Sequence, residues 1–229
     1  MAKPRAEGVT DLMERAEAAS RRRAWFEAER LAGKALAIAR AADDFDAMAR
    51  ILLPLQEARR QRLAEAFETK KVRVLAEAPN EQTQVSPGIH LVEPPLGGAD
   101  ARRFRLLALE QEVPVAVVCR EPITRLNECP IVAIGPVTIR TRIAPPKKPS
   151  APTPSWMAKA LEQLGDSVLE NLDPGIDLLK RIDHLLNCLE THPDHEKMHQ
   201  ALAEFCREAA RLGLRTPPPA TPAGYAEEA

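Results

Sequence analysis

Cysteine and histidine side chains gather near the C-terminal end of the sequence, at spacings that suit a metal ion. His184 and Cys188 are four residues apart, as are His195 and His199, so each pair shares one face of a predicted helix. A hairpin of these helices would bring Cys188, His192, His195 and His199 together, and thiolate and imidazole are zinc ligands. The spacing matches no zinc motif, however, and polar residues are common at a turn. We expect a solvated hairpin tip and no cofactor, with zinc as the alternative.

A second candidate is an anion site at a glycine pair. Gly97 and Gly98 lie between a predicted strand and a predicted helix, and Arg102 follows them. Glycines allow a ligand close to the backbone, and the free N–H groups at a helix start favour negative charge. The segment is neither of the glycine-rich nucleotide motifs, so a simple turn is the other interpretation.

A third candidate is the loop after the most apolar strand. Ligands of open α/β sheets bind at the carboxyl ends of strands, and here Cys119, Arg120, Glu121 and Arg125 follow such an end. Cys119 would need a base to act as a nucleophile, and His90 is the histidine of this segment. We expect Cys119 to be a buried structural cysteine, and we keep ligand binding by Arg120 and Arg125 as a hypothesis.

The composition is that of a globular protein with an aliphatic core. Of the 229 residues, 45% are hydrophobic, 28% are charged and only 3% are aromatic, which favours packed helices. No apolar run is long enough to span a bilayer, and the first residues lack the apolar region of a signal peptide. The four cysteines form no close pair. We therefore expect a cytoplasmic protein with reduced cysteines and no membrane partner.

Charge is distributed unevenly along the chain. The net charge is +3 over residues 1–71, +2 over residues 72–155 and −6 over residues 156–229. Two arginine clusters, 21–23 and 59–62, are interleaved with glutamates and lack stacking aromatics, so we expect solvated helix faces. No segment has the basic excess of a nucleic-acid-binding protein, and such a partner is not favoured.

Changes in hydrophobic period divide the chain and predict an α+β fold. We expect a helical part over 1–70, a small α/β domain over 71–144, a proline-rich extended linker over 145–155, a helical part over 156–215 and a disordered tail over 216–229. The α/β part is a small mixed sheet with a βαβ unit. Its strands are predicted at 72–75, 88–92, 113–119, 131–134 and 137–143, and its helix at 99–112.

Small and apolar residues recur at helical spacing within residues 9–42. The set comprises Ala16, Ala28 and Ala35, the aromatic Trp25, and Leu36 and Ile38. In this pattern the stretch resembles one tetratricopeptide repeat, a helical hairpin of about 34 residues. Arg23 and Arg40 stand where that family has glycine and proline. The resemblance implies a protein-binding helical module, although one repeat is fewer than an independent array needs.

Helix ends are predicted from capping residues. A third helix follows residues 43–44, and Pro54 should kink or break it because proline lacks an N–H. In the C-terminal part we expect helices to begin after three capping residues and the last to stop at Gly213. The three predicted N-caps are Ser155, Asp173 and Thr191.

No convergent set of acid, base and nucleophile accompanies these elements. We therefore expect a non-catalytic protein-interaction or scaffold protein whose partner is another protein. The alternative is an α/β domain, with or without enzymatic activity, that binds a small molecule or phosphate through the Gly97–Gly98 and Arg120–Arg125 loops.

Overall fold

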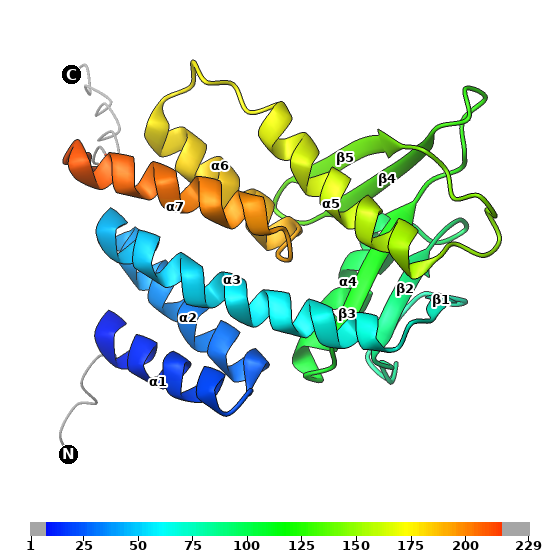
Figure 1. The fold of residues 1–229 in the computed structure, drawn as a ribbon, viewed down its shortest axis with the longest axis horizontal. Helices are drawn as coiled ribbons and strands as arrows, with labels where there is room; N and C mark the ends of the chain where they lie inside the picture. The colour runs from blue at the N-terminus through cyan, green and yellow to red at the C-terminus, as the bar shows by residue number, and fades with distance from the viewer. Residues whose placement is uncertain (1–7, 217–229) are drawn as a thin grey trace, which may run out of the picture.

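Helices at both ends of the chain enclose a central sheet in the computed structural model, which describes residues 8–216 (Figure 1). This arrangement confirms the predicted α+β class. The helices are α1 (Val9–Arg21), α2 (Trp25–Ala41), α3 (Phe45–Glu68), α4 (Gly98–Glu110), α5 (Pro154–Glu170), α6 (Leu178–Thr191) and α7 (Glu196–Arg211). The strands are β1 (Val72–Val74), β2 (Gly88–Val92), β3 (Val115–Arg120), β4 (Cys129–Ile134) and β5 (Thr138–Ile143).

The sheet has the order β1-β2-β3-β4-β5 and is mixed. Strands β1, β2 and β3 are parallel, whereas β4 and β5 each run antiparallel to the strand before. The parallel neighbours β2 and β3 are joined through α4, which is the predicted βαβ unit.

Helices cover both faces of the sheet because its side chains alternate between two apolar clusters. Val92 and Cys119 pack with Ala101 of α4 on one face. Ile89 and Ala116 belong to the main core on the other face, where α3 and α5 lie. Both faces of the parallel strands are therefore buried.

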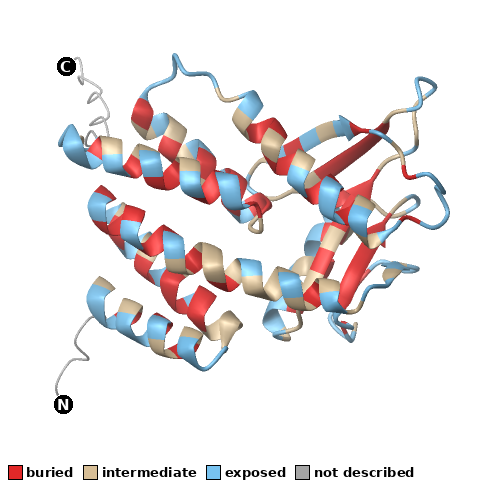
Figure 2. Cartoon of the chain, in the orientation of Figure 1, coloured by how far each residue is buried: buried red, intermediate tan, exposed pale blue. Residues whose placement is uncertain are grey.

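One hydrophobic cluster crosses the boundaries between the three predicted parts. It contains Leu52 of α3, Ile89 of β2, Leu185 of α6 and Leu202 of α7, all at most 1% exposed. Figure 2 shows that buried residues lie both on the sheet and on the helices from the two ends of the chain. Helices α3 and α7, from opposite ends of the chain, lie side by side (Figure 1). The helical parts consequently form one bundle beside the sheet.

The proline-rich stretch, residues 145–155, connects β5 to the start of α5. Pro146 and Pro152 within it are buried. Just beyond it, the Trp156 Nε1–H donates to the carbonyl of Ala144 at 2.9 Å. The two segments that this stretch joins are thus packed against each other, since α5 lies on β5.

Several predicted helix boundaries are wrong. The break expected at Pro54 is absent, because one continuous helix α3 spans Phe45–Glu68. Helix α6 begins four residues later than expected, because the Asp177 carboxylate accepts from the N–H groups of Leu179 and Lys180. The N-caps are Thr153, Asp177 and His195 rather than Ser155, Asp173 and Thr191.

The stop of α7 is confirmed. Gly213 has a φ of +60°, and the Leu214 N–H donates to the carbonyl of Ala209 at 3.1 Å. Just beyond it, the Thr216 N–H donates to Asp43 at 2.8 Å. The rest of the predicted tail, residues 217–229, lies outside the described part. Among residues 8–216, no helix has both the length and the apolar character that crossing a membrane requires.

Candidate functional site

The C-terminal histidines are buried, so the expected solvated hairpin tip is wrong. His192, His195 and His199 are each at most 3% exposed. The turn between α6 and α7 is covered by α5, and His192 Nε2 lies 2.9 Å from the carbonyl of Leu161 in that helix. Burial, together with the neighbouring His195, lowers the pKa of His192 to about 3. The ring is therefore neutral at physiological pH.

His199 is also neutral, and both its ring nitrogens have protein partners. Its Nδ1 lies 3.0 Å from the carbonyl of His195 and must donate there, so its Nε2 accepts from the Arg59 guanidinium at 3.2 Å. Burial and the charge of Arg59 lower the pKa of His199 to about 3. The Cys188 Sγ lies 3.5 Å from His184 Nε2, and burial raises the pKa of the thiol to about 11.

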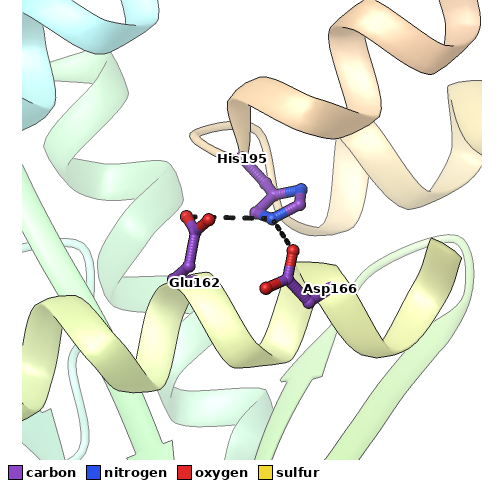
Figure 3. Close-up of side chains that lie close together, drawn as sticks. All are labelled: Glu162, Asp166 and His195. Atoms are coloured by element: carbon purple, nitrogen blue, oxygen red, sulfur yellow. Dashed lines mark hydrogen bonds and ion pairs between the residues drawn. The ribbon is translucent and has the colours of Figure 1, made fainter. Parts of the chain in front are cut away.

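The four predicted zinc ligands do not meet at one point. Within the described residues, one group of three potential ligands has its ligand atoms within 4.8 Å of one another, and it consists of Glu162, Asp166 and His195 (Figure 3). The two carboxylates lie one turn apart on α5, and His195 points at them from the start of α7. His195 Nε2 is 3.2 Å from Asp166 and 3.9 Å from Glu162.

Two features of these three residues favour a role in capping the start of α7 through ion pairs over a role as a metal centre. His195 Nδ1 accepts from the Met198 N–H at 3.3 Å, so in the neutral ring Nε2 carries the proton and donates to Asp166. Burial lowers the pKa of His195, which favours this neutral form. Lys197 also places its ammonium 2.7 Å from Glu162 and 2.8 Å from Asp166. A metal would have to displace both this ammonium and the Nε2 proton.

The glycine pair at the start of α4 serves local packing. The Gly97 N–H, which an anion would use, already donates to the Asp100 carboxylate at 3.0 Å. A β-carbon on Gly98 would lie 2.7 Å from Ile134 Cδ1, so this glycine lets α4 approach β4. Arg102 is exposed on the first turns of α4.

The two predicted loops meet through an ion pair. Arg120, at the end of β3, contacts the Glu93 carboxylate at the end of β2 and donates to the carbonyl of Pro149 at 2.8 Å. Arg120 is 9% exposed, and its Nη1 has no hydrogen-bond partner in the described chain. Arg125, by contrast, lies exposed in the following loop. The structure therefore places Arg120 in contact with the segment that leads to the glycine pair, whereas Arg125 lies apart from it.

Cys119 is buried, as predicted, and its surroundings oppose nucleophilic chemistry. It is 3% exposed, and burial beside Glu121 and Asp100 raises the pKa of its thiol to about 11. At neutral pH the unreactive thiol form dominates.

A groove between α1 and α3 is lined mainly by apolar side chains and is open to a partner. Its volume is about 720 Å³. The apolar lining includes Val9, Met13, Ile51, Leu53 and Pro54, and the charged lining includes Glu14, Glu17, Arg50 and Glu57. Leu53 is 71% exposed.

The chain matches no protein-family model, no curated protein and no solved structure.

Sequence reasoning missed the groove and the carboxylates of the trio. Leu53, just before Pro54, lies on the side of α3 that faces away from the core. A large apolar residue at such a position was the signal that could have revealed the groove. Glu162 and Asp166 have the i, i+4 spacing that places carboxylates together, but nothing local pairs them with His195.

Proposed function

We propose that this protein is an interaction module that binds another protein through the groove between α1 and α3. The observation that carries the proposal is the accessible apolar lining. Leu53 is largely exposed, and Val9, Met13 and Pro54 beside it are only partly covered. A contiguous apolar hollow on a protein surface favours a binding site over random exposure.

The repeat-like hairpin supports the same reading. Ala16, Ala28 and Ala35, the small residues of the tetratricopeptide resemblance, are all at most 2% exposed. Helices α1 and α2 pack closely, and α3 adds a third helix to their layer. The groove opens on this layer, between its first and third helices.

The lining also suggests the chemistry of the partner. The part of α1 that lines the groove, residues 9–17, spans roughly 12 Å along the helix axis, or about two helical turns. Three glutamates and one arginine contribute to the lining, although Arg21 and Arg60 partly offset Glu17 and Glu57. We therefore propose that the occupant is a short amphipathic helix with apolar residues at i, i+3 and i+4 and lysine or arginine beside them.

The test is selection of peptides on the full-length protein. A display library of two-turn amphipathic helices is panned on the wild-type chain, and the dissociation constants of enriched peptides are measured. Leu53→Asp is expected to weaken binding at least about tenfold, because burying a leucine is worth about 1.5–3 kcal/mol.

Leu126→Asp is the matched control. Leu126 is 80% exposed, but it lies in the loop between β3 and β4, away from the groove. Its substitution should leave the affinity unchanged. Failure to enrich any peptide, or equal binding to the Leu53→Asp protein, would refute the groove as the binding surface.

A further inference from the structure

A cluster of charged side chains lies between α2, α3, α4 and the turn before α7. Arg59 Nε donates to Glu29 at 2.9 Å, and Arg62 Nε is 2.7 Å from the other oxygen of the same carboxylate. Arg62 also lies 3.9 Å from Asp194. The predicted solvated arginine face is therefore wrong for these two residues, whose side chains are only 15% and 11% exposed. Glu29 balances only one of the two guanidiniums.

Arg105 of α4 adds a third guanidinium to this cluster. It donates to the carbonyl of Thr191, yet no carboxylate lies within 4.0 Å of it in the part of the chain that the structure describes. Burial and the nearby arginines lower the pKa of Arg105, while Asp194 raises it. An arginine side chain nevertheless stays protonated in proteins. A partly buried cation without a paired carboxylate is costly, and an anion from outside the chain would offset that cost.

A cavity of about 260 Å³ opens beside this cation. Arg59, Arg62 and Arg105 line it together with Glu29 and Asp194. The volume is below the range of about 300–1,000 Å³ typical of sites for drug-sized ligands, so the cavity suits a small group. A guanidinium presents parallel N–H donors that match the oxygens of a phosphate or carboxylate.

We propose that this cavity is a binding site for a small oxyanion, a phosphate or a short dicarboxylate, held by the Arg105 guanidinium with Arg59 and Arg62 beside it. The site is separate from the predicted one at Gly97 and Gly98, which lies at the opposite end of α4. It is also independent of the groove between α1 and α3.

Besides Glu29, which is paired with Arg59 and Arg62, two further carboxylates line the cavity and set the conditions for binding. Glu190 is exposed at the rim, where water screens its charge. The Asp194 side chain is only 14% exposed, and this desolvation raises its pKa although Arg62, Arg59 and Arg105 face it; Glu29 raises the pKa further. A protonated Asp194 can donate to the anion. The affinity for the anion should therefore increase as the pH falls.

The experiment is calorimetric titration of the full-length protein with inorganic phosphate and, separately, with succinate. Sodium chloride at matched ionic strength is the reference. We expect saturable binding of one anion per chain, and the comparison of the two anions shows which geometry the site prefers. Arg105→Met should weaken binding about 10- to 100-fold, because charge-assisted hydrogen bonds are lost. The proposal is overturned if neither phosphate nor succinate gives a saturable heat of binding to the wild-type protein.

Two variants locate the binding. Arg125→Met removes an exposed arginine of the rival loop and should leave the affinity unchanged; loss of binding in this variant, or its persistence in Arg105→Met, overturns the assignment to this cavity. Asp194→Asn removes a negative charge and should tighten phosphate binding several-fold at pH 7. If Arg105→Met does not fold, the Asp194→Asn result decides, and unchanged or weaker binding then counts against the site.

Discussion

The ring of His195 lies directly against the backbone of Gly165. A β-carbon built on Gly165 would stand 2.1 Å from His195 Cγ, which is far closer than β-carbons approach other side chains in proteins. The ring has little freedom to move away, because Asp166 and the Met198 N–H hold its two nitrogens. This close approach is what allows α5 to cover the turn between α6 and α7.

Gly165→Ala is therefore expected to destabilise the protein by about 1–3 kcal/mol, the usual cost of overpacking a core. The free energy of unfolding is measured by urea denaturation. Gly33→Ala is the matched control, since Gly33 also lies within a helix but has no atom within 4 Å of a built β-carbon. That change should stabilise the protein by about 0.5–1 kcal/mol through helix propensity alone. Equal effects of the two substitutions would contradict the packing argument.

The buried histidines predict a loss of stability in acid. The pKa values of His192 and His199 fall from the ordinary 6.5 to about 3 on folding. Below pH 6.5 the unfolded chain binds protons that the folded chain does not, so stability is full above that pH and is lost as the pH falls toward 3. At pH 5 the expected loss is about 2 kcal/mol for each histidine.

The measurement for this prediction is the free energy of unfolding in urea at pH 7 and at pH 5. His199→Gln should reduce the difference between the two values by about 2 kcal/mol, since glutamine does not titrate. The raised pKa of Asp194 acts in the opposite sense, because it adds stability at low pH that is lost as the pH rises. Asp194→Asn should therefore steepen the loss of stability in acid. A pH dependence that His199→Gln leaves unaltered would show that other groups control it.

A bidentate ion pair connects the two helical ends of the chain. Arg40 of α2 donates to both oxygens of Asp183 in α6, at 2.8 and 3.0 Å. A double-mutant cycle with Arg40→Ala and Asp183→Ala should give a coupling energy of about 0.5–1 kcal/mol, because the pair is only partly exposed. The pair of Arg50 and Asp46 on α3, whose side chains are 73% and 71% exposed, is the control and should couple much less. Equal coupling in the two cycles would argue against a role for Arg40 in joining the ends.

Zinc should not stabilise the wild-type protein. His195 Nε2 carries the proton that Asp166 accepts, and the Lys197 ammonium already pairs with both Glu162 and Asp166. Addition of one equivalent of zinc, or of a chelator, is expected to leave the thermal unfolding midpoint unchanged. Stoichiometric zinc in the purified protein, with a lower midpoint after chelation, would show that the trio with Cys188 or His192 rearranges into a metal site.

The sequence by itself determined the element types. Helical spacing at both ends, β-branched runs such as 113–119 and the stop at Gly213 are encoded by neighbours within a few residues, so they can be read locally. The buried state of Cys119 was predictable for the same reason, since it closes a continuous apolar strand. Capping positions were less predictable, because several candidates such as Asp173 and Asp177 compete within one loop.

Only the tertiary structure decided which polar residues are buried and what they contact. Arg59, Arg62 and His199 belong to elements that are polar enough to be solvated. His199 is buried and the two arginine side chains are largely covered, because α2, α7 and the sheet pack against α3. Glu162 and Asp166 meet His195 because α5 folds back over the turn before α7. Such contacts join residues about 30 positions or more apart, and they follow from how whole helices pack rather than from any local pattern.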